Sequence, residues 1–76
     1  MLGKNITNAE EIKRLIRMYD EGDNVENIID KTKLVSWDVF KVVFNFRFSF
    51  KKPDEFTNDE LWKLVTTEVK TFKGGA

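Results

Sequence analysis

The chain contains neither cysteine nor histidine, and it has only 76 residues. A chain of this length forms one small domain, whose core rarely supplies more than about 3–5 kcal/mol of net stability. Without these two residue types it cannot add a disulfide or a structural zinc site of the usual kind. We therefore expect stability to come from dense aromatic packing or from self-association. Seven Phe, two Trp and one Tyr provide the rings for such packing.

The same absences narrow the chemistry that the chain can perform. Histidine is the commonest general base and the commonest metal ligand, so we expect no enzyme, no bound metal and no cofactor. The segment 20–23 (Asp-Glu-Gly-Asp) slightly resembles a calcium loop, but it lacks the alternating ligands and the closing Glu. The four glycines form no phosphate-binding run. Thirteen basic and thirteen acidic side chains cancel, which disfavours both a strongly basic nucleic-acid coat and an acidic mimic of DNA.

The N-terminal residues lack the apolar segment of a secretory signal. The longest mostly apolar stretch, residues 39–50, is interrupted by four polar side chains and is shorter than the roughly 20 residues that span a bilayer. We therefore expect a cytoplasmic protein with no membrane partner.

The first predicted helix follows residue 7. Thr7 as N-cap and Glu10 three residues later would form a capping box. The apolar residues that follow recur at helical spacing on one face, and Gly22 provides the stop. These apolar residues are Ile12, Leu15, Ile16 and Tyr19.

A short second helix follows, capped by Asp23 or Asn24 and ending around residues 31–33. Its apolar face carries Val25, Ile28 and Ile29. The apolar pair at 34–35 then lies in a connecting turn, where we expect it to point inward.

The third element carries two competing patterns. Ser36 as N-cap and the apolar residues after it predict a helix from 36 to 44. Phe residues at 44, 46, 48 and 50 alternate with polar residues, which is typical of a half-buried strand. We therefore expect the helix to give way to an extended segment that ends near Phe50.

The last predicted helix covers residues 57–73. Thr57 and Glu60 form a capping box, and Phe56 and Leu61 stand at the positions of a hydrophobic staple. Residues 74–76 would be a flexible tail. The prediction is one domain over 1–76, mainly α, with a three-helix core over 7–46, a short extended aromatic segment and a C-terminal helix.

Residues 12–43 resemble a helix-turn-helix of the homeodomain-like, three-helix kind found in resolvases, transposases and many small bacterial and phage regulators. Leu34, Val39 and Val43 fill the apolar positions of its turn and third helix. The chain departs from the pattern where Lys33 replaces the usual turn glycine and Ile29 replaces a small alanine. Val35 likewise replaces a polar residue of the pattern.

This resemblance implies a DNA-binding transcriptional regulator of phage or mobile-element type, acting as a homodimer because one such module makes few base contacts. Residues 34–52 carry four basic side chains against one acidic, a net charge of +3, which favours phosphate contacts. The side chains expected to face the groove are Trp37, Lys41 and Asn45. Those expected to contact phosphates are Lys33, Ser36, Arg47, Lys51 and Lys52.

The aromatic residues leave other functions open. A recognition helix is normally polar toward the groove, whereas residues 37–46 place rings around much of the circumference. The chain could instead be a small protein-interaction module, such as a phage-type inhibitor or adaptor of a host protein, acting through an aromatic surface without nucleic acid. The Phe ladder could also pair with another strand, stack on single-stranded nucleic acid, or simply form the core.

Overall fold

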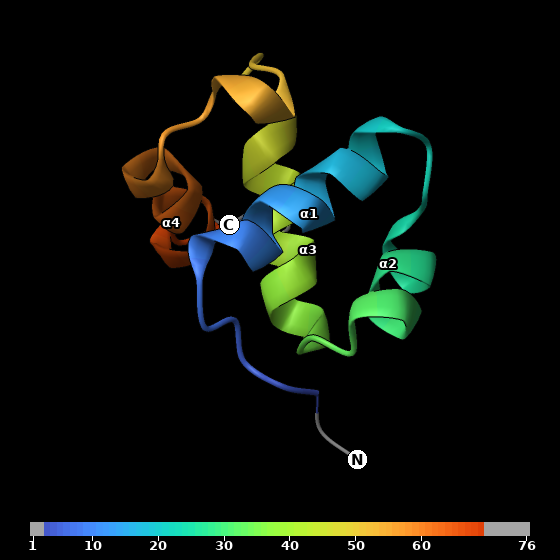
Figure 1. The fold of residues 1–76 in the computed structure, drawn as a ribbon. Helices are drawn as coiled ribbons and strands as arrows, with labels where there is room; N and C mark the ends of the chain where they lie inside the picture. Colours follow the sequence, from blue (N-terminus) through green and yellow to red (C-terminus); the bar gives the residue numbers. More distant parts are fainter. Residues whose placement is uncertain (1–2, 70–76) are drawn as a thin grey trace, which may run out of the picture.

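The computed structural model describes residues 3–69, which form four α-helices and one turn of 3-10 helix. The expectation of a mainly helical protein is confirmed. The elements are α1 (Ala9–Asp20), α2 (Val25–Thr32), α3 (Ser36–Arg47), η1 (Pro53–Glu55) and α4 (Asn58–Thr66). In Figure 1, α1 crosses in front of α3, with α2 and α4 on opposite sides of the pair. Helix α3 packs against all three other α-helices.

The core lies where α1, α3 and α4 meet, and α2 closes one side of it. Helix α3 turns one face inward, and this face packs against the apolar stripe of α1. The ring of Phe46 meets Tyr19 edge-on at 6.2 Å between ring centroids and also lies 6.0 Å from Phe56. The buried core residues are Ile12, Leu15, Ile16, Ile28, Leu34, Val39, Val42, Val43, Phe46, Leu61 and Leu64.

Helix α1 begins one residue later than the sequence pattern predicts. Its N-cap is Asn8, whose side-chain oxygen accepts from the Glu11 amide at 3.1 Å. The carboxylate of Glu11 in turn accepts from the Thr7 amide at 2.7 Å. The predicted pairing of Thr7 with Glu10 is therefore wrong by one position, because Asn8 and Glu11 offer the same spacing.

Helix α2 is capped by Asn24, as one of the two predicted alternatives. It ends at Thr32, and Lys33 takes a left-handed backbone conformation with φ of 61°. This is the conformation that favours glycine at a helix C-terminus. Leu34 is buried as predicted, while Val35 is half-buried.

The predicted extended segment over 44–50 is wrong. Helix α3 continues without interruption to Arg47, and residues 3–69 contain no strand beyond a single β-bridge. Consecutive residues of an α-helix are about 100° apart, so Phe44 and Phe46 point to opposite faces. The alternating rings thus serve two faces of one helix. Ser36 is also not the N-cap: Val35 occupies that position without a side-chain cap.

Helix α4 has the capping box that the sequence predicts. Thr57 accepts from the Glu60 amide at 3.1 Å, and the Glu60 carboxylate accepts from the Thr57 amide at 2.9 Å. The helix ends at Thr66, seven residues before the predicted end, and Val69 is buried outside it. The rest of the predicted helix and the predicted tail, residues 70–76, lie outside the described residues.

Candidate interaction surface

Four large rings line the outward face of α3. They follow one another at spacings of three and four residues, so they share one stripe along the helix. This stripe lies opposite the face that Val39 and Val42 turn into the core. We call these residues, Trp37, Phe40, Phe44 and Phe48, the aromatic stripe.

The rings of the aromatic stripe pack in two pairs; three of them remain exposed to solvent, and Phe44 is half-buried. Trp37 stacks on Phe40, with 5.7 Å between ring centroids and 22° between planes. Phe44 and Phe48 lie 4.9 Å apart. Trp37, Phe40 and Phe48 remain 47%, 45% and 64% exposed, although large rings are among the side chains that gain most from burial.

Helix α3 is therefore apolar on both faces. A helix of a small monomeric domain normally pairs one apolar stripe with a polar outer face. A helix that is apolar all round belongs to the interior of a larger assembly. In this chain Val42 and Phe46 are covered by α1 and α4, whereas the outward rings have no such cover within residues 3–69. The outward face of α3 thus has the apolar composition of a protein core, but it is not buried within residues 3–69.

Phe50 extends the apolar surface past the end of α3. Its side chain is 92% exposed and its φ is 58°, a left-handed conformation that a bulky side chain rarely adopts. The three exposed rings of the aromatic stripe offer roughly 300 Å² of surface, taking about 200 Å² for a whole ring side chain, and Phe50 adds roughly 180 Å² of its own. A patch of a few hundred Å² is the size of the largest apolar patch on a typical monomeric protein, and such a patch is often functional.

Two cations border the aromatic stripe. Lys41 follows Trp37 by four residues, and Arg47 follows Phe44 by three, so the two lie on opposite sides of the row of rings. Arg47 is exposed and Lys41 is half-buried. No carboxylate in the described part of the chain lies within ion-pair distance of either side chain. The charges that flank the rings are therefore free to meet a partner.

The structure brings together only some of the residues that the sequence analysis proposed for nucleic-acid contact. Trp37 and Lys41 lie on the outward side of α3, and Ser36 is exposed at its first turn, about 140° around the helix from Lys41. Lys33 is exposed in the turn that precedes α3, and its ammonium lies 3.7 Å from Asp30. Three further candidates lie beyond the middle of α3 or after it: Arg47, Lys51 and Lys52.

Two of the proposed contact residues are occupied inside the fold. The side-chain amide of Asn45 donates to the carbonyls of Leu64 at 2.8 Å and Thr67 at 3.2 Å, so it faces α4 rather than a groove. The ammonium of Lys51 donates to Glu60 at 2.5 Å. This contact holds the pKa of the Glu60 carboxyl below its ordinary value, and the Thr57 amide adds to that effect. The prediction that Asn45 faces a groove is therefore corrected, whereas the side chain of Lys51 is still 38% exposed.

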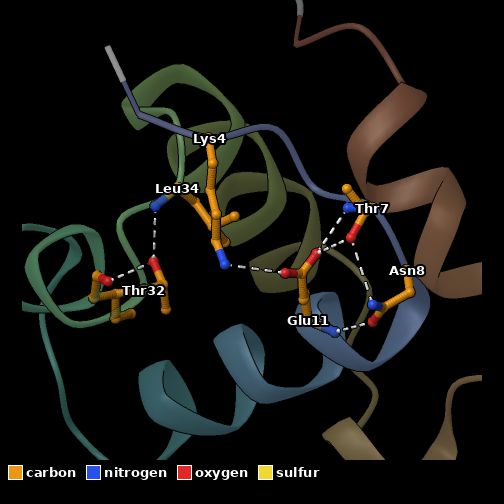
Figure 2. Close-up of polar contacts among 7 residues, drawn as sticks. Lys4, Thr7, Asn8, Glu11, Thr32 and Leu34 are labelled. Carbon is orange, nitrogen blue, oxygen red and sulfur yellow. Dashed lines mark hydrogen bonds and ion pairs between the residues drawn. The ribbon is translucent and has the colours of Figure 1, made fainter. Parts of the chain in front are cut away.

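An N-terminal arm, residues 3–7, holds the turn between α2 and α3. The Lys4 amide donates to the Lys33 carbonyl at 2.8 Å, and the Val35 amide donates to the Lys4 carbonyl at 2.9 Å. Figure 2 shows Lys4 lying alongside Leu34 while its ammonium reaches Glu11, 3.4 Å away. Mainly because Glu11 accepts from a backbone amide, the pKa of its carboxyl is lowered. Nothing in the composition of residues 3–7 marks a bridging segment, so the sequence does not predict this arm.

Residues 3–69 were also compared with the requirements of a metal site and of a membrane-spanning helix. They contain no group of three or more side chains suited to hold a metal ion. Over the same range, none of the helices has the length and apolar composition needed to cross a bilayer. Comparison with protein-family models, with curated proteins and with solved structures finds no match to this chain.

Proposed function

We propose that this protein is a small interaction module that binds another protein through the aromatic stripe. The observation that carries the proposal is that α3 is apolar on both faces while only one face is covered within residues 3–69. Exposed aromatic rings are the side chains that most often dominate the energy of protein interfaces. Burying them against a partner removes the cost of keeping them in water.

The position of the rings argues against α3 as a reader of duplex DNA. Base edges in the major groove are read by polar, hydrogen-bonding side chains such as Arg, Asn and Gln. A helix inserted with its free face toward the groove would place Trp37, Phe40 and Phe44 against those polar edges. Asn45, the one amide of α3, is already bonded to α4. A partner with an apolar surface satisfies these rings better than a duplex does.

Site-specific photocrosslinking in the cells of origin tests the proposal. A photoreactive phenylalanine analogue at Phe44 should yield a discrete adduct with another protein, because that ring lies within the stripe. The same analogue at Glu26, which is exposed on α2, serves as the matched control and should yield none. Adding the substitutions Trp37→Glu and Phe48→Glu should abolish the adduct while the far-ultraviolet circular dichroism stays unchanged. Equal labelling at both positions would contradict the proposal.

Duplex DNA binding is the second candidate, supported by the connection between α2 and α3. Three residues join the two helices, and Lys33 has the left-handed backbone that a helix-turn-helix turn often requires. Lys33, Ser36 and Lys41 would then approach phosphates near the first turns of α3. Lys41→Glu should abolish retention on heparin and duplex DNA without unfolding the protein. Retention that survives this charge reversal would exclude α3 as the reading helix.

A further inference from the structure

We infer that the partner segment covering the aromatic stripe is an amphipathic helix whose apolar seam is bordered by acidic side chains. This inference rests on the proposed function and adds the chemistry of the partner. It is drawn from the length of the stripe, from the hydrogen bonds of α3 and from the cations beside the rings.

The dimensions of the stripe suit a helix. Trp37 and Phe48 are eleven residues apart, which corresponds to about 17 Å along the helix axis, or three turns. Rings at spacings of three and four residues form a ridge, and a second helix packs its own side-chain rows beside such a ridge. A partner helix of about three to four turns would therefore cover the whole stripe.

A β-strand is a poor alternative partner. Strand addition depends on an exposed edge of unpaired backbone groups. Apart from the groups at its two ends, the backbone of α3 is hydrogen bonded within the helix, so it offers no strand-like edge and mainly its side chains are available to a partner. A partner must therefore be recognised by packing against the rings. A helix with apolar side chains at spacings of three and four residues places them at the same intervals as the rings of the aromatic stripe.

The charges beside the stripe select an acidic partner. Lys41 and Arg47 stand on opposite sides of the rings, and neither is paired with a carboxylate in the described chain. Asp38, the acidic residue of α3, lies farther round the helix than Lys41. If Glu or Asp borders the apolar row of the partner helix, a carboxylate lies near each of the two cations. If Lys borders that row, a positive charge lies near each cation and repels it.

A second copy of this chain suits the stripe less well. Lys41 is the sixth of the twelve residues of α3, so it lies at the middle of the helix. Antiparallel pairing of two stripes about a two-fold axis would bring the two Lys41 side chains close together at that axis. Parallel pairing about a two-fold axis along the helices would place Lys41 of one copy on the same side of the rings as Arg47 of the other. Either arrangement sets like charges together beside the rings.

Two matched peptides test the inference. Each has about 18 residues, long enough to form a helix, with Leu at positions i, i+3, i+4 and i+7. One carries Glu on both borders of the Leu seam, and the other carries Lys at the same positions. Binding to the full chain is measured by titration with ¹⁵N chemical-shift mapping, which also locates the site.

The expected result is that the Glu peptide binds about ten-fold more tightly than the Lys peptide at low salt, with shifts confined to α3 and its neighbours. The preference should shrink at high salt, because these charges are exposed to solvent. The double variant Lys41→Gln and Arg47→Gln should remove the preference but keep binding of both peptides. Trp37→Ala should weaken both peptides to a similar extent.

The possible failures are distinct. Equal affinity for both peptides at the stripe would overturn the acidic partner and leave the proposed function in place. No shift at α3 with either peptide, together with no photocrosslinked protein, would overturn both. Sedimentation that shows a dimer broken by Trp37→Glu would assign the stripe to a second copy and overturn the inference. Binding of duplex DNA that the Glu peptide cannot displace would also overturn it.

Discussion

The side-chain amide of Asn45 donates a 2.8 Å hydrogen bond to the Leu64 carbonyl and so closes the C-terminal end of α4 from a neighbouring helix. A helix leaves its last carbonyls without intrahelical partners, and this chain places no glycine there to satisfy them. The bond satisfies one carbonyl of the last turn of α4 and ties that helix to α3. It also makes Asn45 a structural residue.

We expect Asn45→Ala to lower the free energy of unfolding by about 1–2 kcal/mol, because the half-buried carbonyl loses its donor. Urea denaturation followed by circular dichroism measures this change. Asn27→Ala, an exposed position in α2, is the control and should stay within about 0.5 kcal/mol of the parent. Equal effects at the two positions would show that the Asn45 bond contributes nothing.

Lys33→Gly should stabilise the protein by about 0.5–1 kcal/mol. Lys33 holds a left-handed conformation that disfavours residues with a Cβ, and glycine removes that penalty at a small entropic cost. Thermal unfolding gives the measurement. The same substitution two residues earlier, Lys31→Gly, lies inside α2 and should destabilise by about 1 kcal/mol. A loss of stability in Lys33→Gly would mean that the backbone at this turn is not strained.

Much of the fold follows from local sequence patterns. The capping box of Thr57 and Glu60 is present as predicted, since both bonds depend only on residues three apart. The boundary of α1 shifts by one because Asn8 with Glu11 satisfies the helix start at the same spacing as Thr7 with Glu10. Capping patterns in the sequence locate the start of a helix to within a residue or two, but they do not decide between neighbouring N-cap residues such as Thr7 and Asn8.

The parts that sequence patterns miss depend on tertiary contacts. The alternating Phe residues favour a strand locally, yet Phe46 packs on Tyr19 and Asn45 bonds to α4 only if the helix continues. The bond to α4 also turns the Asn45 amide inward, and a separate ion pair joins Lys51 to Glu60. The aromatic stripe was visible as helical spacing at 37, 40, 44 and 48, but the competing period-two pattern hid it.

Gly3→Ala should detach the N-terminal arm. A Cβ at Gly3 would lie 2.6 Å from the carbonyl group of Leu34, closer than any real contact, so the arm must move. Hydrogen exchange should then accelerate at the Lys4 and Val35 amides, which are bonded across this bridge. Asn5→Ala, an exposed change in the same arm, should leave both amides protected. Unchanged protection in Gly3→Ala would refute the close approach.

Acid should destabilise this protein. Arg17 donates to Asp54 at 2.7 Å, and this contact holds the pKa of the Asp54 carboxyl below its ordinary value. The pKa values of Glu11 and Glu60 are lowered as well. A carboxyl with a lower pKa in the folded state binds protons more readily when unfolded, so its contribution is present at neutral pH and is lost as the pH falls.

We therefore expect the melting temperature to be nearly constant from neutral pH to about pH 5 and to fall below about pH 4, where such carboxyls begin to protonate. Asp54→Asn should reduce the slope of that fall, whereas Asp59→Asn, at an exposed position outside these ion pairs, should not. The effect of each group is small because Asp54 is exposed and Glu11 and Glu60 are only partly buried, so solvent screens all three. A melting temperature that rises on acidification would contradict the assignment.

Phe50→Gly should separate stability from binding. Its left-handed φ of 58° strains a bulky residue, and its ring is 92% exposed, so glycine should raise the free energy of unfolding by about 0.5–1 kcal/mol. The same change removes a ring from the end of the aromatic surface, so affinity for the Glu-bordered peptide should fall about three-fold or more. Lys33→Gly relieves equivalent strain away from the rings and should leave that affinity unchanged. The strained conformation and the exposed ring of Phe50 are the observations that motivate this test of a role in binding. If Phe50→Gly gained stability and bound the peptide as well as the parent, Phe50 would lie outside the interface.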